Sequence, residues 1–419
     1  MLPSTGETVT KKYDFILSLG IRRGESWLDR HDIKENDASD AIVVPMKTQV
    51  GGIAKHKEPM RQIRLPSKTK NNAVDVSATP PKCFALKPLR MAKPAGDDAP
   101  PASPLDHRSY KELAFYEALD IVRDPSLDDA ASAPERATEP PTPSRKGPRI
   151  TRPCDDQHTR LVLLLETTAP HLSTAESPPD RLASSNSASR DIVEEIHLLR
   201  ALSVLTSKYY GVFAFRADVP PSLFLVIENA TAGFSVPCVM DLKVGTNTYA
   251  PDATVEKKRN EIAKYPLQST MGFRIVGMQI HATGGEASGD QERGIQTFDK
   301  KYGTSLVTMA QVENAMRMFF LLKMSHRTTE DEIIKMQKKL HVFLSKLSEI
   351  IQWFERNHIF KFYSSSLLIA HEGDMTISSD DVVVKLIDFA HVRRLAGKDI
   401  GYMKGLSNLN QMIKRILSN

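Results

Sequence analysis

The residues best suited to chemistry lie in Pro237-Cys-Val-Met-Asp-Leu-Lys-Val-Gly245, near the middle of the chain. Residues 237–242 have the character of a β-strand, so Asp241 and Lys243, two positions apart, project from the same face. Gly245 follows, where the missing side chain lets the backbone approach a ligand. These residues predict a nucleotide or phosphate site, although a salt-bridged pair on a solvated sheet face fits the same residue types.

A further aspartate lies at the end of an apolar segment. Val382-Val-Val-Lys-Leu-Ile-Asp-Phe-Ala-His391 is typical of a buried strand that ends with Asp388. A carboxylate in such a place is costly unless it is compensated, and a metal ion is one good solution. The residue types alone leave other forms of compensation open.

Two elements in the first third of the chain carry a second possible charge pair. Residues 82–90 alternate as a short strand that ends near Pro88, and this strand carries Lys87. Residues 109–119 have the spacing of a helix with a serine cap, and Glu112 lies in its first turn. Glu112 either closes a capping box or pairs with Lys87.

Two motifs resemble signatures of the inositol polyphosphate kinase family. Pro237, Asp241, Lys243 and Gly245 reproduce the pattern P-x-x-x-D-x-K-x-G, and Ser-Ser-Leu-Leu at 365–368 followed by Ile-Asp-Phe-Ala-His at 387–391 reproduces the second. Residues 265–268 and 272–281 are similar to the multikinase branch of the family. The resemblance covers roughly residues 205–419 well and 82–119 more thinly.

The resemblance implies a nucleotide site that uses ATP and Mg²⁺. Lys87 would bind the ATP phosphates with support from Glu112, and Asp388 would ligate magnesium. Asp241 would be directed to the ribose. The backbone of Glu228 and Ala230 would contact the adenine as the hinge between two lobes.

The resemblance also implies an inositol phosphate pocket. Lys243 would act on the transferring phosphoryl group or the acceptor hydroxyl. The remaining substrate residues would be Lys257, Asn260, Lys264, Lys300 and His391. Residues 257, 260, 261 and 264 form one stripe of the charged helix expected at 253–264, and such a stripe is more often only the solvated side of a helix.

Three positions depart from the family pattern. Asn260 and Gln279 stand where glutamine and arginine are expected, and the lost cation at 279 would change which phosphates are held. Residues 48–53 only weakly match a Gln-x-x-Gly-His element that covers the nucleotide phosphates in the family.

We expect an α+β fold with two lobes, a smaller one with an antiparallel sheet and a helix, and a larger one with a sheet and helices. Residues 1–45 would be an extension, 46–230 the smaller lobe and 231–419 the larger. Segments near 57–81, 91–107 and 124–190 are rich in Pro, Ser and charged residues, and their composition predicts disordered inserts. Residues 282–299 would be a loop, and long helices with apolar stripes are expected at 308–323 and 330–356.

Composition limits the kinds of ligand and cellular compartment to expect, but it does not identify a specific partner. The chain has 419 residues, a net charge of +5 and 41% hydrophobic residues, which favours anionic ligands and a sizeable core. Its three cysteines have no paired spacing, and no 18-residue apolar run occurs. We therefore expect a soluble monomer of the cytoplasm or nucleus, without a membrane span, whose inserts bind regulatory proteins. The basic patch at 145–152 is either an import or anion-binding element or a solvated linker.

Three classes of function follow from these features. The first is an ATP-dependent kinase that phosphorylates inositol tris- and tetrakisphosphates, with an inositol hexakisphosphate kinase that makes pyrophosphates as the alternative. The second is an inactive scaffold, which the presence of residues 87, 241, 243 and 388 disfavours. The third is a nucleic-acid binder, which is disfavoured because the cations are dispersed and lack interleaved aromatic residues.

Overall fold

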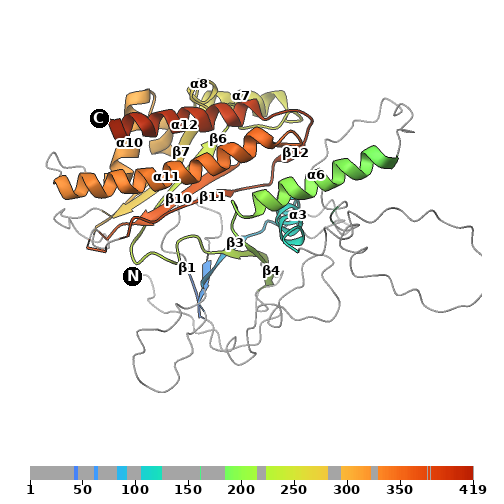
Figure 1. Ribbon diagram of the computed structural model, residues 1–419, viewed down its shortest axis with the longest axis horizontal. Helices are drawn as coiled ribbons and strands as arrows, with labels where there is room; N and C mark the ends of the chain where they lie inside the picture. Colours follow the sequence, from blue (N-terminus) through green and yellow to red (C-terminus); the bar gives the residue numbers. More distant parts are fainter. Residues whose placement is uncertain are drawn as a thin grey trace, which may run out of the picture.

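A computed structural model describes residues 42–45, 61–64, 83–91, 105–124, 161, 185–214, 223–281, 294–321, 329–374, 376–377 and 379–418. These residues form two five-stranded antiparallel sheets with helices, as expected for an α+β protein (Figure 1). The smaller sheet has the order β1-β2-β3-β5-β4, and the larger has the order β11-β10-β6-β7-β8. The expected elements at 48–53 and 145–152 lie outside the described residues.

The smaller sheet combines predicted and unpredicted strands. The strand expected at 82–90 is β3 (Cys83–Pro88), and β4 (Tyr209–Ala214) and β5 (Leu223–Glu228) form an antiparallel pair. Two further strands, β1 (Ile42–Pro45) and β2 (Arg61–Arg64), pair with each other, and β2 also pairs with β3. The assignment of 57–81 to a loop was therefore wrong at 61–64, because tertiary pairing stabilises a strand whose sequence carries little periodic signal.

Two helices pack beside the smaller sheet. Helix α3 (His107–Ile121) begins two residues before the predicted start, because Asp106 caps it by accepting a hydrogen bond from Ser109 N at 2.7 Å. The predicted serine cap was therefore wrong. Helix α6 (Ser185–Ser203) contacts α3 and begins inside the stretch predicted as an insert.

The larger sheet is built around the strand that carries the first motif. Strand β6 (Pro237–Val244) pairs on one side with β10 (Ser366–Glu372) and on the other with β7 (Phe273–His281). The edges are β11 (Val382–Ile387) and β8 (Ile295–Phe298). Strand β8 lies in the stretch expected to be a loop, and β11 ends before Asp388, earlier than predicted.

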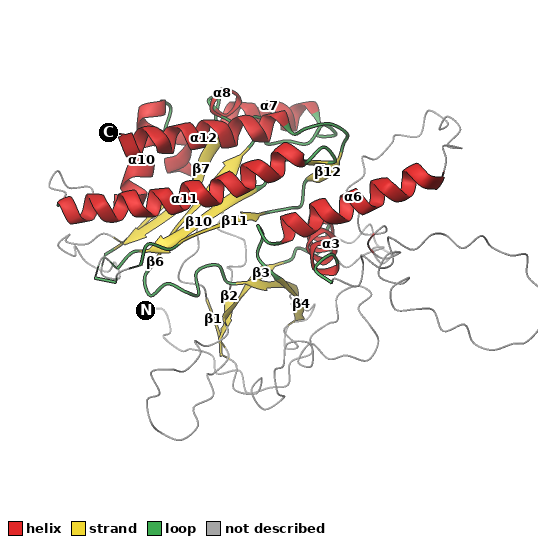
Figure 2. Cartoon of the chain, in the orientation of Figure 1, coloured by secondary structure: helices red, strands yellow, loops and turns green. Residues whose placement is uncertain are grey.

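Long helices cover one face of this sheet (Figure 2). Helix α11 (Glu330–Arg356) starts at a capping box formed by Thr329 and Glu332, and it packs on α12 (Ile400–Ser418) and on α10 (Met309–Leu321). Its apolar stripe is buried as expected, except for Ile333, which is 39% exposed. The described helices include none that combines the length and apolar character of a membrane span.

Short elements complete the larger lobe. Helices α7 (Val255–Lys264), α8 (Gln268–Met271) and α9 (Lys300–Ser305) flank β7, and β9 (Phe360–Phe362) pairs with β12 (Val392–Arg394). Helix α12 lies against Gly272, where a Cβ on Gly405 would be 2.1 Å from the Gly272 carbonyl oxygen. Glycine at 405 is therefore required for this close approach.

The larger sheet and its helices contact the smaller lobe through α6 and the segment that follows it. Leu386 of β11 donates its backbone N–H to Leu205 O at 2.9 Å, next to a parallel bridge between Thr206 and Leu386. Trp353 of α11 donates to Leu198 O of α6 at 2.8 Å. These contacts fix the smaller lobe relative to the strand that leads to Asp388.

Candidate active site

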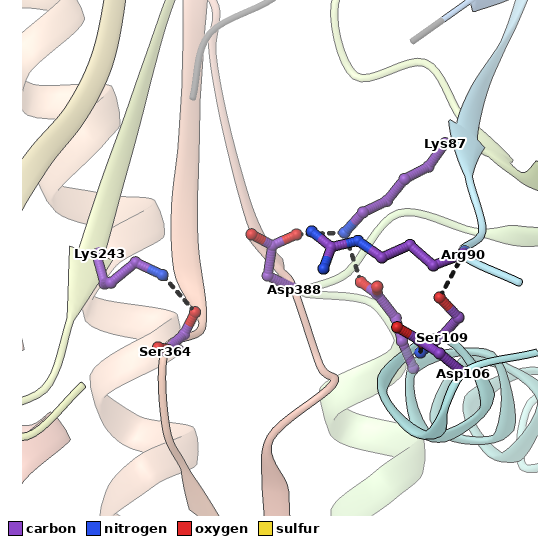
Figure 3. Close-up of polar contacts among 8 residues, drawn as sticks. Lys87, Arg90, Asp106, Ser109, Lys243, Ser364 and Asp388 are labelled. Atoms are coloured by element: carbon purple, nitrogen blue, oxygen red, sulfur yellow. Dashed lines mark hydrogen bonds and ion pairs between the residues drawn. The ribbon is translucent and has the colours of Figure 1, made fainter. Parts of the chain in front are cut away.

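Lys87 joins the two lobes at the centre of the candidate site (Figure 3). Its Nζ lies 2.6 Å from Glu112 Oε1 on α3 and also contacts Asp388 Oδ1, which is 301 positions away in sequence. Burial lowers the pKa of Lys87, but Asp388 and Glu112 more than offset this effect and raise it overall. Glu112 is thus a partner of Lys87 and does not close a capping box.

Asp388 is held in place by backbone conformation and by packing. Its φ of 66° is in the left-handed region, which aspartate tolerates better than most residues. The next residue, Phe389, packs on Phe115 of α3, with ring centroids 5.0 Å apart. The turn therefore directs the carboxylate of Asp388 towards Lys87, while the side chain keeps 38% of its surface exposed.

Asp241 and Lys243 do not form the solvated ion pair considered above. Asp241 is only 6% exposed, and its Oδ1 has no hydrogen-bond partner among the described residues. Burial and the charge of Asp388 raise the pKa of Asp241 to about 6, against the opposing effect of Lys243. Lys243 Nζ donates to Ser364 O at 2.8 Å, and burial lowers its pKa.

This donor set fits a magnesium ion that is completed by substrate. The described part of the chain holds no cluster of three or more His, Cys, Asp or Glu side chains arranged for a metal ion. It does hold Asp388, whose carboxylate keeps 38% of its side chain exposed and lies close enough to the buried Asp241 to raise the pKa of that residue. Mg²⁺ commonly takes one or two carboxylates and completes its shell with waters and substrate phosphates.

The expected hinge follows β5. The backbone N–H of Glu228 donates to Lys208 O at 2.8 Å, so this group is already used within the smaller lobe. Asn229 Oδ1 accepts hydrogen bonds from Thr231 N and Oγ1, which stabilises the turn that contains Ala230. The structure places both predicted residues at the start of the connection between the lobes.

A group of cations surrounds His391. Burial and the charges of Lys257, Arg108, Arg393 and Lys243, in decreasing order, lower the pKa of His391 to about 4. Its ring is therefore neutral at pH 7 in the unliganded protein. The structure thus brings Lys243, Lys257 and His391 together, as expected for a pocket that binds an anion.

The other predicted substrate residues are less tightly placed. Asn260 and Lys300 are exposed, and Lys264 is exposed and paired with Glu261 of the same helix. Gln279 is 3% exposed in β7, so this substitution leaves an uncharged side chain inside the sheet. No described contact links these four residues to Asp388.

Three cations near this site were not predicted from the sequence: Arg108 and Arg393, which act on His391, and Lys111, which Arg393 affects in turn. Arg108 and Lys111 lie on α3, and Arg393 lies on β12, two residues after His391. Lys111 and Arg393 are 4% and 5% exposed, although buried cations are uncommon. Their signal in the sequence was weak: Lys111 precedes Glu112, and Arg393 follows the second motif.

Comparison with known proteins identifies the same part of the chain. Residues 224–414 match the family model described as inositol polyphosphate kinase. Human inositol polyphosphate multikinase is 31% identical over 181 residues, which cover 43% of this chain and 38% of that protein. Mouse inositol hexakisphosphate kinase 2 is 31% identical over 235 residues, which cover 46% of this chain and 49% of that protein. The chain therefore spans at most about half the length of these curated relatives.

A solved structure of an inositol phosphate multikinase from S. cerevisiae, in complex with ADP and Mn²⁺, matches with a TM-score of 0.43 and 24% identity. The match covers 52% of this chain and 90% of that one. Both motifs occur in the order expected, and the family model matches residues 224–414, so this part of the chain is similar to the inositol polyphosphate kinases.

Proposed function

We propose that this protein is an ATP-dependent kinase that transfers a phosphoryl group to a hydroxyl of an inositol polyphosphate. The observation that supports this most strongly is that three separate parts of the fold, β3 with Lys87, β6 with Asp241 and Lys243, and the turn after β11 with Asp388, bring their charges close enough to interact. The similarity of residues 224–414 to the inositol polyphosphate kinases supports the same reaction class.

The residues divide into a nucleotide side and an acceptor side. Lys87, held by Glu112, would bind ATP phosphates, and the turn at 228–230 would contact the adenine. Asp241 would bind the ribose, and Asp388 would hold Mg²⁺, which neutralises the negative charge of the phosphates. Lys243 would stabilise the charge that develops on the transferring group, because its charge interacts both with Asp388 and with His391.

Phosphoryl transfer of this kind depends on position and charge more than on covalent chemistry. Lys243 Nζ donates a hydrogen bond to Ser364 O in the unliganded protein, so its ammonium is already oriented before substrate arrives. The neutral ring of His391 can accept a hydrogen bond from an acceptor hydroxyl or donate one to a phosphate oxygen. The acceptor is therefore positioned by charges that exist before binding.

The multikinase and hexakisphosphate kinase activities are distinguished by their products. We favour transfer to inositol tris- and tetrakisphosphates, with pyrophosphate formation from the hexakisphosphate as the second candidate, since relatives of both kinds match at similar identity. We further propose a monomer that acts in the cytoplasm or nucleus.

The test is a product analysis with the purified chain, ATP, Mg²⁺ and each of four acceptors, from the tris- to the hexakisphosphate. We expect ATP-dependent mass increases of one phosphate or more with the lower acceptors, and loss of these products in Asp388→Asn. Products from the hexakisphosphate alone would favour the second candidate. Absence of ATP-dependent product with all four acceptors would refute the proposed function.

A further inference from the structure

An ion pair of unequal exposure lies beside the candidate acceptor pocket. Arg393 Nη2 is 3.3 Å from Asp252 Oδ2, and the side chains are 6% and 47% exposed respectively. Arg393 Nη1 also donates to Val392 O at 3.0 Å, which fixes the guanidinium. The carboxylate of Asp252 therefore covers the guanidinium of Arg393 from the solvent side. Of the two side chains, Asp252 is the one that can move away into solvent.

A second buried cation shares this carboxylate. Lys111 is 4% exposed, and its Nζ has no hydrogen-bond partner among the residues that the structure describes. Burial and then Arg393 lower the pKa of Lys111, whereas Asp252 raises it. Two buried positive charges, Arg393 and Lys111, are thus balanced by the single negative charge of the half-exposed Asp252. The site can therefore accept a further negative charge.

The position of the pair relates it to the acceptor. Arg393 lies two residues after His391. Burial and then nearby cations, among them Lys257 of α7 and Arg393, lower the pKa of His391. Asp252 lies just before α7, so the loop that carries the carboxylate also leads to Lys257. The neighbouring Arg394 has a different partner, since its Nη2 lies 2.7 Å from Glu195 Oε2 of α6.

We propose that Arg393 and Lys111 form a phosphate subsite of the acceptor pocket and that Asp252 takes the place of the phosphate when no acceptor is bound. The proposal rests on the proposed function, because it concerns the same pocket. A phosphate dianion offers three oxygens, so it can accept from the planar fork of Arg393 and from Lys111 together, which the carboxylate of Asp252 does not do here. Binding would exchange one ion pair for another without a covalent step.

The exchange predicts opposite effects for the two partners. Removing Arg393 or Lys111 weakens binding of an acceptor, whereas removing Asp252 strengthens it, because the phosphate no longer competes with a tethered carboxylate. The gain from Asp252→Asn must require Arg393, since the carboxylate acts on binding only by covering that side chain.

The experiment is calorimetric titration of the full chain with inositol hexakisphosphate in the absence of nucleotide. This probe carries a phosphate at every ring position, so it fills the subsite in any orientation. We expect Arg393→Gln and Lys111→Met each to weaken binding about tenfold, which corresponds to about 1.4 kcal/mol. Asp252→Asn should tighten it about threefold or more.

Two further variants make the result specific. Lys398→Gln removes the same charge from an exposed position five residues after Arg393 and should leave binding unchanged. Arg393→Lys keeps the charge but loses the planar fork, and should lie between wild type and Arg393→Gln. Thermal unfolding of each variant identifies any that fail to fold. If Arg393→Gln or Lys111→Met does not fold, the binding affinities of Asp252→Asn and Arg393→Lys test the proposal instead.

Absence of binding by the wild-type chain would overturn the subsite. So would equal binding by Arg393→Gln and Lys398→Gln, or tightening by Asp252→Asn that persists in an Arg393→Gln background. The titration needs no ATP, so it is separate from the test of transfer. A chain that binds in this pattern but makes no product would refute the kinase proposal and leave the subsite intact.

Discussion

The two ends of strands β6 and β10 contain similar buried polar residues with different surroundings. At one end, Cys238 pairs with His371 in the register, followed by Glu372. At the other end, Lys243 pairs with Ser366, and Asp241 lies two residues before Lys243. Both ends carry carboxylates and are approached by lysines, so residue type alone does not distinguish them.

The end near Cys238 is satisfied by hydrogen bonds. Glu372 accepts from the backbone N–H groups of Ser235, Val236 and Asp374 at 2.8–3.0 Å. Lys339 Nζ donates to Glu372 O at 2.7 Å and lies 3.3 Å from His371 Nδ1. Burial and Lys339 lower the pKa of His371 to about 3, so the ring stays neutral.

The end near Lys243 is not satisfied in the same way. Asp241 Oδ1 is buried without a hydrogen-bond partner among the described residues, and burial and Asp388 raise the pKa of Asp241 more than Lys243 and Ser366 lower it. The carboxylates of Asp241 and Asp388 also act unfavourably on each other. The comparison teaches that a buried charge marks a ligand site when the protein leaves it uncompensated, whereas a charge with a full set of donors is part of the scaffold.

The largest expected effect separates the two ends by activity. Lys243→Met should lower kcat by about a hundredfold or more, because it removes a preoriented cation from the transferring group. The far-UV circular dichroism should be unchanged. If the variant keeps activity within a few fold of wild type, the end near Lys243 does not contribute to catalysis more than the end near Cys238.

A change of carboxylate to amide tests the scaffold end. Glu372→Gln replaces one accepting oxygen by an amide donor that faces a backbone N–H, so we expect destabilisation by about 2–4 kcal/mol. Chemical denaturation measures this loss, and the folded fraction should retain its activity. Unchanged stability would mean that the three hydrogen bonds contribute little.

The matching change at the other end should have the opposite sign. Asp241→Asn removes a buried charge whose pKa is raised to about 6, so the unliganded protein should gain roughly 1–3 kcal/mol at pH 7.5 while losing activity. A raised carboxyl pKa means that the folded form binds the proton more tightly. The wild type should therefore become more stable relative to this variant as pH falls from about 7 to 4.

A stability curve for both proteins from pH 4.5 to 8 measures that difference. If the gain stays constant across this range, or if Asp241→Asn is destabilised at pH 7.5, the claim of an uncompensated carboxylate fails.

The smallest effect concerns the two histidines. NMR titration should place the pKa of His391 near 4 in the free protein and move it upward when a polyanion neutralises the cations around it. His371 should not respond, because it is enclosed at the scaffold end. A lowered histidine pKa also means that stability contributed by His391 is lost as pH falls from about 6.5 to 4.

Much of the larger lobe could be predicted because its signals are local. The strand character of β6 and the apolar stripe of α11 both lie within short windows. Strands β1, β2 and β8 were missed because each has four residues and depends on pairing. The start of α3 was misplaced because Asp106, not Ser109, provides the cap.

The sequence by itself determined the two motifs, their resemblance to inositol polyphosphate kinases and the residues at 87, 241, 243 and 388. Only the tertiary structure decided that Lys87 meets Asp388 across 301 positions, that Glu112 joins them, and that Arg393 and Lys111 share Asp252. Motifs are fixed by neighbouring residues, whereas the charge balance of a buried group depends on what the fold brings within a few ångströms of it.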